Sequence, residues 1–279
     1  MSSAVQMYAL VRDTFRESLA RKIFWGFLGC STALILFFLL ALNIDLVEGA
    51  MAAVTLFGKE VDGGQLVNVQ LIVHKILGVV AAFLFTAGLF LAVFASAGLI
   101  PTVFEPGRIE LLLSKPVSRP RLLLGRYFGT LAVIACNMFY LVLGVWAVLG
   151  VKTHIWNLNF LLAAVLAVFA FAVLLTVVLL VAVLSSSGVL ATMVAYFFLI
   201  MSVPLAQHAQ LAPLFRRPWA REVVKWLYYV FPKIYDLGNM ARLAMEGKGF
   251  QTWMPVWSSG VFAMVMLTAG LWFFARKDY

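Results

Sequence analysis

Long apolar stretches without a single Lys, Arg, Asp or Glu alternate with short polar segments along the chain. About 20 apolar residues in a helix suffice to cross the roughly 30 Å hydrocarbon core of a membrane. The pattern therefore predicts an all-α polytopic membrane protein with six transmembrane helices. The expected spans are residues 23–42, 76–100, 127–151, 158–184, 189–206 and 253–275.

The fourth and fifth spans lie in one uncharged tract, residues 153–215. A single helix of that length would be about 95 Å long, roughly three times the hydrocarbon thickness. The tract must therefore fold back on itself. Small turn-forming residues, Ser185, Ser186, Ser187 and Gly188, predict the turn of a helical hairpin.

Composition supports this interpretation, because 64% of the residues are apolar and only 12% are charged. A typical soluble domain has about 45–50% apolar and about 25% charged residues. The 279 residues suffice for one membrane domain, so we expect a single transmembrane domain over 1–279. Cys30 and Cys136 lie inside apolar stretches, which argues against a disulfide framework or a metal site.

The positive residues behind the net charge of +9 mostly flank the apolar stretches instead of forming one patch. Nucleic-acid binding is therefore disfavoured, and Lys and Arg are interpreted as markers of the cytoplasmic side. They predict a multi-pass protein of a plasma or bacterial inner membrane with both termini in the cytoplasm. The flanking residues are Arg12, Arg16, Arg21, Lys22, Arg108, Lys115, Arg119, Arg121, Arg126, Arg276 and Lys277.

One segment, residues 207–252, opposes this rule, since it would lie outside yet carries seven basic and three acidic residues, a balance of +4. Its apolar residues recur at helical spacing, opposite Arg221, Glu222 and Lys225. We expect external interfacial or re-entrant helices before the last span, interrupted at Pro232. The apolar positions are Trp219, Val223, Trp226, Leu227, Val230 and Phe231.

Residues 1–22 are also amphipathic. Tyr8, Val11, Phe15 and Leu19 form one stripe, and charged residues lie opposite it. Glu17 and Arg21 have the favourable i,i+4 spacing of a helical ion pair. The pattern predicts an interfacial helix leading into the first span, with a solvated helical tail as the alternative.

The spans lack the residues that membrane chemistry requires. Proton-coupled carriers need ionisable groups in the membrane, and a membrane enzyme needs an acid–base pair or a metal cluster. His74, His154 and His208 are scattered, and Asn137 is expected to bond a neighbouring helix. No Gly-x-x-x-x-Gly-Lys-Ser/Thr motif occurs in the sequence. The chain is therefore expected to be non-catalytic, with any ATP hydrolysis in another polypeptide.

The most patterned polar segment lies in the cytoplasmic loop, residues 101–126. A turn at Pro106–Gly107 precedes a short helix with one apolar face, and Pro116 ends it. Ser118 is placed to cap the next helix, with Pro120 in its first turn. Such a short amphipathic helix suits docking into a groove on a partner protein. The alternative is that the charges only set orientation and the apolar face lies on lipid.

This loop resembles that of type-2 ABC exporter permeases, whose pattern is Glu, then Gly-Thr-Ile/Leu-Glu-x-Leu-Leu-Ser-x-Pro-Val-Ser-Arg, then an apolar run with Gly-Lys. The chain departs at Pro106 and at Arg108, where the family often has Thr. Residues 228–232 resemble a stretch in the subgroup linked to multicopper-enzyme maturation. The matching positions are Glu105, Gly107, Ile109, Glu110, Leu112, Leu113, Ser114, Pro116, Val117, Ser118, Arg119, Gly125 and Arg126.

The resemblance implies a permease subunit whose loop helix is a coupling helix seated in a separate ATP-binding subunit. ATP and Mg²⁺ would bind in that subunit and no cofactor in this chain, and two permeases, identical or homologous, would form the pathway. An alternative function is a subunit that passes ATP-driven motion to an external partner protein and moves no substrate. The expected coupling residues are Glu105, Gly107, Ile109, Glu110, Leu112, Leu113, Ser114 and Arg119.

Overall fold

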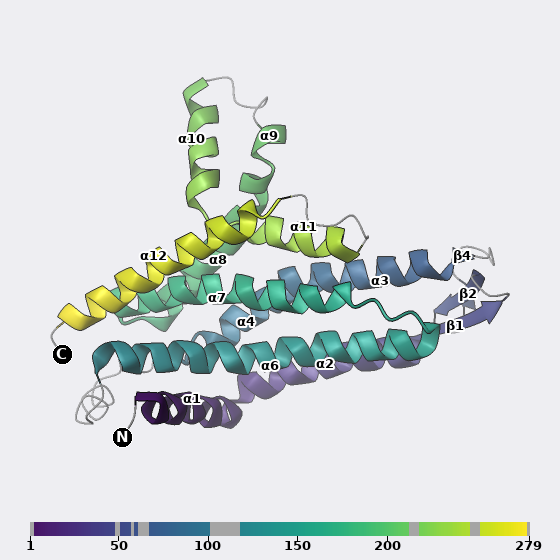
Figure 1. Ribbon diagram of the computed structural model, residues 1–279, viewed down its shortest axis with the longest axis horizontal. Helices are drawn as coiled ribbons and strands as arrows, with labels where there is room; N and C mark the ends of the chain where they lie inside the picture. The colour runs from purple at the N-terminus through teal and green to yellow at the C-terminus, as the bar shows by residue number, and fades with distance from the viewer. Residues whose placement is uncertain are drawn as a thin grey trace.

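The computed structural model describes residues 3–47, 51–56, 59–60, 67–100, 118–211, 218–245 and 252–277. Its body is a bundle of long helices (Figure 1). The helices that build the bundle are α1 (Ser3–Ala20), α2 (Lys22–Ala41), α3 (Val69–Phe83), α4 (Leu89–Ser96), α6 (Arg119–Thr153), α7 (Asn159–Ser185), α8 (Gly188–Ala206), α11 (Ile234–Met245) and α12 (Met254–Arg276).

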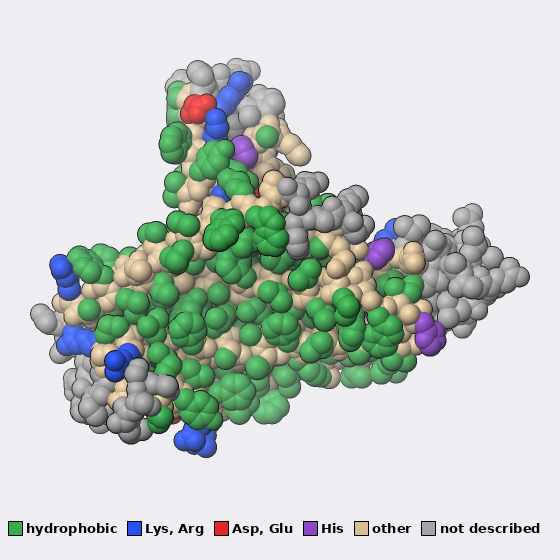
Figure 2. All heavy atoms as spheres, viewed as in Figure 1, with side chains coloured by type: hydrophobic (Ala, Val, Ile, Leu, Met, Phe, Trp, Pro, Cys, Tyr) green, Lys and Arg blue, Asp and Glu red, His purple; other side chains and the backbone are tan. Residues whose placement is uncertain are grey.

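Within the described residues, five stretches are each long and apolar enough to cross a membrane: Val73–Ser96, Arg119–Thr153, Asn159–Ser185, Gly188–Ala206 and Met254–Arg276. The count rises to six when Val5–Ala20 and Phe24–Leu40, which are bent by 72° at their junction, are taken together as one broken span. The predicted architecture of membrane-spanning helices is therefore confirmed, with five to six spans among the described residues. Hydrophobic side chains cover the visible face of the bundle (Figure 2), as expected for a surface in contact with lipid.

The turn between α7 and α8 lies where the sequence predicted it. Helix α7 ends at Ser185, Ser186 adopts a left-handed conformation with φ of 52°, and α8 begins at Gly188. The Ser187 hydroxyl accepts a hydrogen bond from the Leu190 backbone N–H, so it caps α8. The small polar residues thus reverse the chain and supply the cap of the returning helix.

The predicted span 127–151 belongs to a longer helix. Helix α6 has 35 residues and begins directly after Ser118, with Pro120 in its first turn. Ser118 occupies the predicted N-cap position, but its side chain makes no capping hydrogen bond. Because the helix starts earlier than the apolar stretch, Arg119, Arg121 and Arg126 are helical residues of α6.

The segment between α2 and α3 forms a small sheet, which the sequence analysis did not predict. Strand β1 (Leu42–Val47) pairs antiparallel with β2 (Met51–Leu56). Strand β2 also pairs with β3 (Lys59–Glu60) and β4 (Val67–Asn68). The sheet lies at the end of the bundle opposite both chain termini (Figure 1).

Helices α9 (His208–Leu211) and α10 (Pro218–Val230), which we call the arm, rise from the side of the bundle (Figure 1). The apolar side chains predicted to share one face of α10 are largely exposed, with Trp226 at 69% and Trp219 at 61%. The chain breaks at Pro232 as predicted, and α11 then turns back against α7, α3 and α8. Helix α11 buries Ile234, Leu237 and Ala241, so it is part of the core.

Candidate functional site

The candidate site lies at the end of the bundle that holds both chain termini (Figure 1). There α1 crosses the first turns of α6 in close contact. A Cβ atom at Gly129 would lie 2.6 Å from the Thr14 Cβ, and one at Gly125 would lie 2.6 Å from the Leu10 Cβ. Only glycine permits this approach, so Gly125 and Gly129, a small-xxx-small pair, allow α1 to pack closely against α6.

Between these two glycines, Arg126 extends into the α1–α6 contact and is 1% exposed. Its guanidinium is ion-paired with Glu17 on α1, through Nη1 and Oε2. A second carboxylate, Asp13, lies 3.7 Å from Nη2 and is mostly exposed. A buried cation needs such a partner, because removing an unpaired charge from water costs several kcal/mol. Breaking a buried ion pair costs a similar amount.

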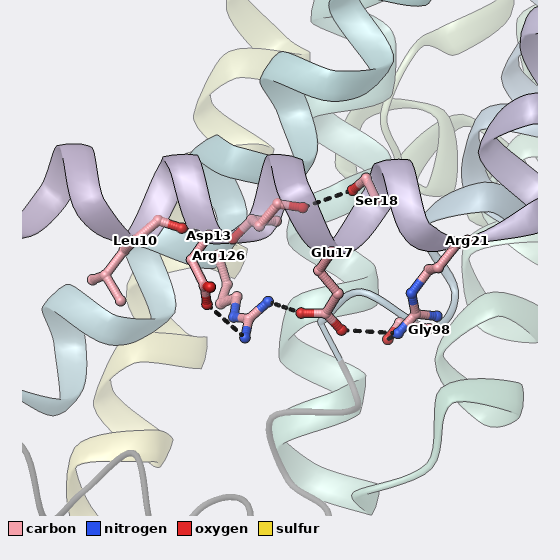
Figure 3. A network of polar contacts seen from close by, with 8 residues as sticks. Leu10, Asp13, Glu17, Ser18, Arg21, Gly98 and Arg126 are labelled. Atoms are coloured by element: carbon pink, nitrogen blue, oxygen red, sulfur yellow. Dashed lines mark hydrogen bonds and ion pairs between the residues drawn. The ribbon is translucent and has the colours of Figure 1, made fainter.

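Glu17 joins this pair to a second arginine (Figure 3). Arg21 Nη2 lies 3.1 Å from Glu17 Oε1 and donates to the Gly98 carbonyl oxygen at 2.9 Å. A Cβ atom at Gly98 would lie 2.1 Å from Arg21 Nη1, so any other residue there would require the guanidinium to move. The predicted Glu17–Arg21 ion pair is confirmed, and it is part of a larger network. We call Asp13, Glu17, Arg21, Gly98 and Arg126 the α1–α6 joint.

The α1–α6 joint contacts both ends of the predicted coupling loop, residues 101–126. Gly98 lies just before the loop, and Arg126 is its last residue. Glu17 of α1 pairs directly with Arg126, and Arg21 of α1, which also pairs with Glu17, donates to the Gly98 carbonyl oxygen. The helical segments on either side of residues 101–117 are therefore both bonded to α1.

A third contact ties the start of α6 to the C-terminal end of the chain. Arg119 Nη1 donates to the Lys277 carbonyl oxygen at 2.7 Å. Lys277 Nζ in turn donates to the Val183 carbonyl oxygen at 2.8 Å, near the α7–α8 turn. The start of α6, the end of α12 and the α7–α8 turn therefore lie together at this end of the bundle.

Of the predicted coupling residues, only Arg119 lies in the described part of the chain. The other seven lie outside the described residues: Glu105, Gly107, Ile109, Glu110, Leu112, Leu113 and Ser114. The structure brings Arg119 to the C-terminal end of α12. It also shows that Arg126, which the sequence analysis placed among the positive residues flanking the spans, is buried in a contact between two helices.

Sequence reasoning placed the charged residues of α1 opposite its apolar stripe, and it did not predict the contact of this helix with α6. The face of α1 turned to α6 contains Leu10, Thr14 and Ser18, of which the two hydroxyl residues are buried. Their hydroxyls bond backbone carbonyls one turn earlier, at 2.9 Å each, so they require no other partner. Leu10 lies against Gly125 and Thr14 against Gly129, so the four-residue spacing of the two glycines was the signal available in the sequence.

Further along α6, polar contacts continue into the apolar part of the bundle. The Ser31 hydroxyl of α2 donates to Asn137 Oδ1 at 2.9 Å, which confirms the predicted interhelical bond of Asn137. Three buried polar atoms on this side of α6 have no hydrogen-bond partner within the described structure: Arg126 Nε, Thr130 Oγ1 and Asn137 Nδ2. Interhelical hydrogen bonds such as Ser31–Asn137 contribute modestly to stability, about 0.6–2 kcal/mol each.

A second buried cation, Lys233, lies at the root of the arm. It is 2% exposed, and its Nζ donates to the Tyr228 carbonyl oxygen at 3.0 Å and to Ser258 Oγ of α12 at 2.8 Å. The Tyr228 hydroxyl donates to Asp236 Oδ2 at 2.9 Å, and the His208 ring stacks on Tyr228. These contacts connect the arm to α11 and α12.

Burial governs the ionisation of this cluster. It lowers the pKa of Lys233, an effect that the charge of Asp236 opposes. Burial also raises the pKa of Asp236, against the Tyr228 hydrogen bond and the charges of Lys233 and His208. The pKa of Tyr228 is raised by burial and by Asp236. Burial thus disfavours the charged forms of Lys233 and Asp236. The cluster binds the arm to the bundle through polar contacts.

Among the described residues, no group of three or more His, Cys, Asp or Glu side chains is placed to hold a metal ion. Cys30 and Cys136 are free thiols.

The family model of the ABC-2 family transporter protein matches residues 8–279. No curated protein matches the chain. Members of the matched family are multi-pass membrane permeases, generally non-catalytic, that normally work with an ABC ATP-binding subunit. Because the match runs from α1 through the last span and includes the α1–α6 joint, the chain belongs to the ABC-2 transporter family.

Proposed function

We propose that the chain is the permease subunit of an ABC exporter, in which ATP hydrolysis in a separate subunit drives export of a substrate. ATP and Mg²⁺ would bind in that partner, because this sequence has no phosphate-binding loop of the P-loop type. Both termini and the loop 101–126 would face the cytoplasm, where the ATP-binding subunit is found. A second copy of the chain, or a homologue, would complete the pathway.

The observation that carries this proposal is the α1–α6 joint. A loop that receives force from an ATPase needs a stiff connection to the spans. Here Glu17 joins Arg126 at one end of the loop to Arg21, and Arg21 holds Gly98 at the other end. Movement of the loop would therefore displace α1, α4 and α6 as a unit.

The partner contact itself is assigned to residues of the loop. Ile109, Leu112 and Leu113 would form the apolar anchor in a groove of the ATPase, and Glu105, Glu110 and Arg119 the polar rim. Gly107 and Ser114 would bound the short coupling helix. Anchors at the centre of an interface typically contribute about 2 kcal/mol or more each, whereas rim charges contribute less.

Purification tests the proposal. The chain isolated from its native membrane in mild detergent should bring with it an ATP-binding subunit with magnesium-dependent ATPase activity. The same chain stripped of partners should neither bind nor hydrolyse ATP. ATPase activity that persists in the stripped chain, and that scales with its concentration, would overturn the assignment.

The alternative is a subunit that passes ATP-driven motion to an external partner protein without moving a substrate. The observation that favours it is the arm, whose apolar face on α10 is exposed while its root is tied to α12 through Lys233 and Ser258. Crosslinking from a photoreactive residue at Trp226 discriminates the two functions. A single external protein crosslinked only while ATP is hydrolysed would favour force transmission, and lipid adducts alone would favour the exporter.

A further inference from the structure

A large cavity of about 1020 Å³ lies between η2 (Leu84–Gly88), α4, α8 and α11, away from the α1–α6 joint. Thr86, Phe90 and Ile200 belong to its wall and are exposed, so the cavity opens on the outside of the bundle. Cys30 of α2 contributes to one edge. Its volume is at the upper end of the range of roughly 300–1,000 Å³ typical of small-molecule sites.

The wall contains an irregular helix turn. Helix α3 passes into α4 through η2, a π-helical turn in which the Leu89 N–H donates to the Leu84 carbonyl oxygen. Such turns are rare and frequently occur at functional sites. Opposite η2, Gly238 of α11 lies so close that a Cβ atom there would be 3.1 Å from Phe85 Cγ. The irregular turn and the glycine together shape this wall.

Polar chemistry is concentrated in α11. Arg242 is the one charged side chain among the described residues of the cavity wall. Its Nε and Nη2 both donate to Asn239 Oδ1, at 3.3 and 3.0 Å, so the amide fixes the orientation of the guanidinium. Asn239 is itself a wall residue. An arginine held in place at an otherwise mostly apolar wall suits a ligand with an apolar body and one anionic group.

We infer that this cavity binds a single-chain anionic amphiphile, with its chain along η2 and α8 and its anionic group at Arg242. A ligand that reaches the cavity from the membrane would enter through the open side beside Thr86. The role of this molecule as cargo rests on the exporter function proposed above, whereas its binding does not. A site at which any lipid chain binds equally well would not need the fixed arginine.

Photolabelling of the full chain in nanodiscs of phosphatidylcholine tests the inference. The probes are lysophosphatidylglycerol and lysophosphatidylcholine of equal chain length, each with a diazirine in the chain. We expect the anionic probe to label peptides within 82–91, 199–204 or 234–242 at about tenfold lower concentration than the zwitterionic probe, as for a charge-assisted contact. Arg242→Gln should abolish this preference, and Arg221→Gln on the arm should preserve it.

Two threonines offer a matched pair for blocking the cavity. Thr86 and Thr268 are both exposed, and both hydroxyls bond the carbonyl oxygen four residues earlier, at 2.7 and 2.8 Å. Only Thr86 belongs to the cavity wall. Thr86→Phe should therefore remove labelling of these peptides by both probes, and Thr268→Phe should leave it unchanged.

Three results would overturn the inference: equal labelling by both probes, a charge preference that survives Arg242→Gln, or labelling of the same peptides in Thr86→Phe. Crosslinks from these peptides to a second copy of the chain, with no lipid adduct, would also overturn it and assign the cavity to a subunit interface. Copurification of the ATPase, measured on the same variants, reports separately on the proposed function.

Discussion

The guanidinium of Arg126, in the first turns of α6, is ion-paired with the carboxylate of Glu17 on the N-terminal helix α1. Arg126 is 1% exposed, so this pair is a buried contact between two helices and differs from a surface salt bridge. Glu17 also holds Arg21, which reaches the Gly98 carbonyl oxygen. One carboxylate thus connects the helical segments on either side of residues 101–117.

Removing that carboxylate should destabilise the protein strongly. In Glu17→Ala, Arg126 keeps only the distant and exposed Asp13 as a partner, and breaking a buried pair costs about 3–5 kcal/mol. Thermal unfolding in detergent should therefore occur at clearly lower temperature than for wild type. Asp13→Ala is the matched control, since an exposed partner contributes about 0–1 kcal/mol. Equal effects of the two variants would contradict the assignment of Glu17 as the main partner.

The same pair allows stability to be separated from coupling. In the double variant Glu17→Leu, Arg126→Met both charges are replaced by apolar groups, which for buried pairs is often neutral or stabilising. We expect the double variant to recover the unfolding temperature of wild type. If the joint transmits force, substrate-stimulated ATPase activity of the complex should nevertheless fall several-fold. Full activity in a stable double variant would show that the pair serves folding alone.

The sequence predicted the spans well, because about 20 consecutive apolar residues without a charge match the thickness of the hydrocarbon core. It also placed the α7–α8 turn at Ser185–Gly188, where three small polar residues interrupt a long apolar tract. The contact of α1 with α6 was not predicted. Amphipathicity reports which face is apolar, whereas this contact depends on the two glycines of α6, Gly125 against Leu10 and Gly129 against Thr14.

The burial of charged side chains could not be predicted from the sequence pattern either. Arg126 follows the basic residues of the loop and therefore resembles one more positive flank, although the Glu17 carboxylate that compensates it is more than a hundred residues away in the chain. Lys233 and Asp236 lie in a segment predicted to be interfacial, and α11 instead buries part of it in the bundle. The β1–β2 pairing arises between α2 and α3, in a stretch for which the sequence analysis predicted no strand.

The glycine contact at the joint predicts opposite effects of the same substitution at two helical glycines. Gly129→Ala should destabilise the protein by about 1–3 kcal/mol, because the new Cβ would lie 2.6 Å from the Thr14 Cβ and force α1 away. Gly29→Ala in α2, where no atom lies within 4 Å of the added Cβ, should be neutral or stabilise by up to about 1 kcal/mol. Thermal unfolding of the two variants measures the difference. A stabilising Gly129→Ala would exclude the close approach of α1 to α6.

The coupling anchor can be tested in the loop itself. Leu112→Asp should abolish copurification of the ATP-binding subunit, because a carboxylate would be buried unpaired in the partner groove. Glu110→Lys, at the rim, should weaken association only moderately and in a salt-dependent way. Insertion and expression should be unaffected in both. If the loop charges only set orientation, Leu112→Asp should leave the complex intact, and removal of Arg119 and Arg121 together should disturb topology.

The predicted placement of residues 207–252 outside the cell can be tested by thiol labelling. In a background without Cys30 and Cys136, cysteines at Gln210 and Gly247 should react with an impermeant maleimide added to intact cells. A cysteine at Ser186, in the α7–α8 turn near Lys277, is the control for the opposite side and should react only after the membrane is disrupted. The reverse pattern of labelling would refute the proposed orientation, and protection of all three sites would refute the six-span arrangement.

The cluster at the root of the arm predicts a pH-dependent stability of definite sign. Burial raises the pKa of Asp236 above its ordinary value of 3.8, so the native state retains a proton that the unfolded chain has already released. Where the native state binds more protons, stability falls as pH rises. The contribution of Asp236 is thus complete below pH 3.8 and is lost as pH rises through the raised pKa.

Asp236→Asn should remove this dependence, because the amide cannot ionise and its oxygen still accepts the hydrogen bond from Tyr228. Relative to wild type, the variant should become progressively more stable as the pH of a thermal-unfolding series rises from about 4 toward neutral. The pKa of Lys233 is lowered by burial, so its contribution to stability has the opposite sign. It makes stability rise with pH between the lowered pKa and 10.5. Glu222→Gln, on the polar face of α10, controls for the loss of one carboxylate. A difference between Asp236→Asn and wild type that stays constant with pH would show that Asp236 does not titrate in this range.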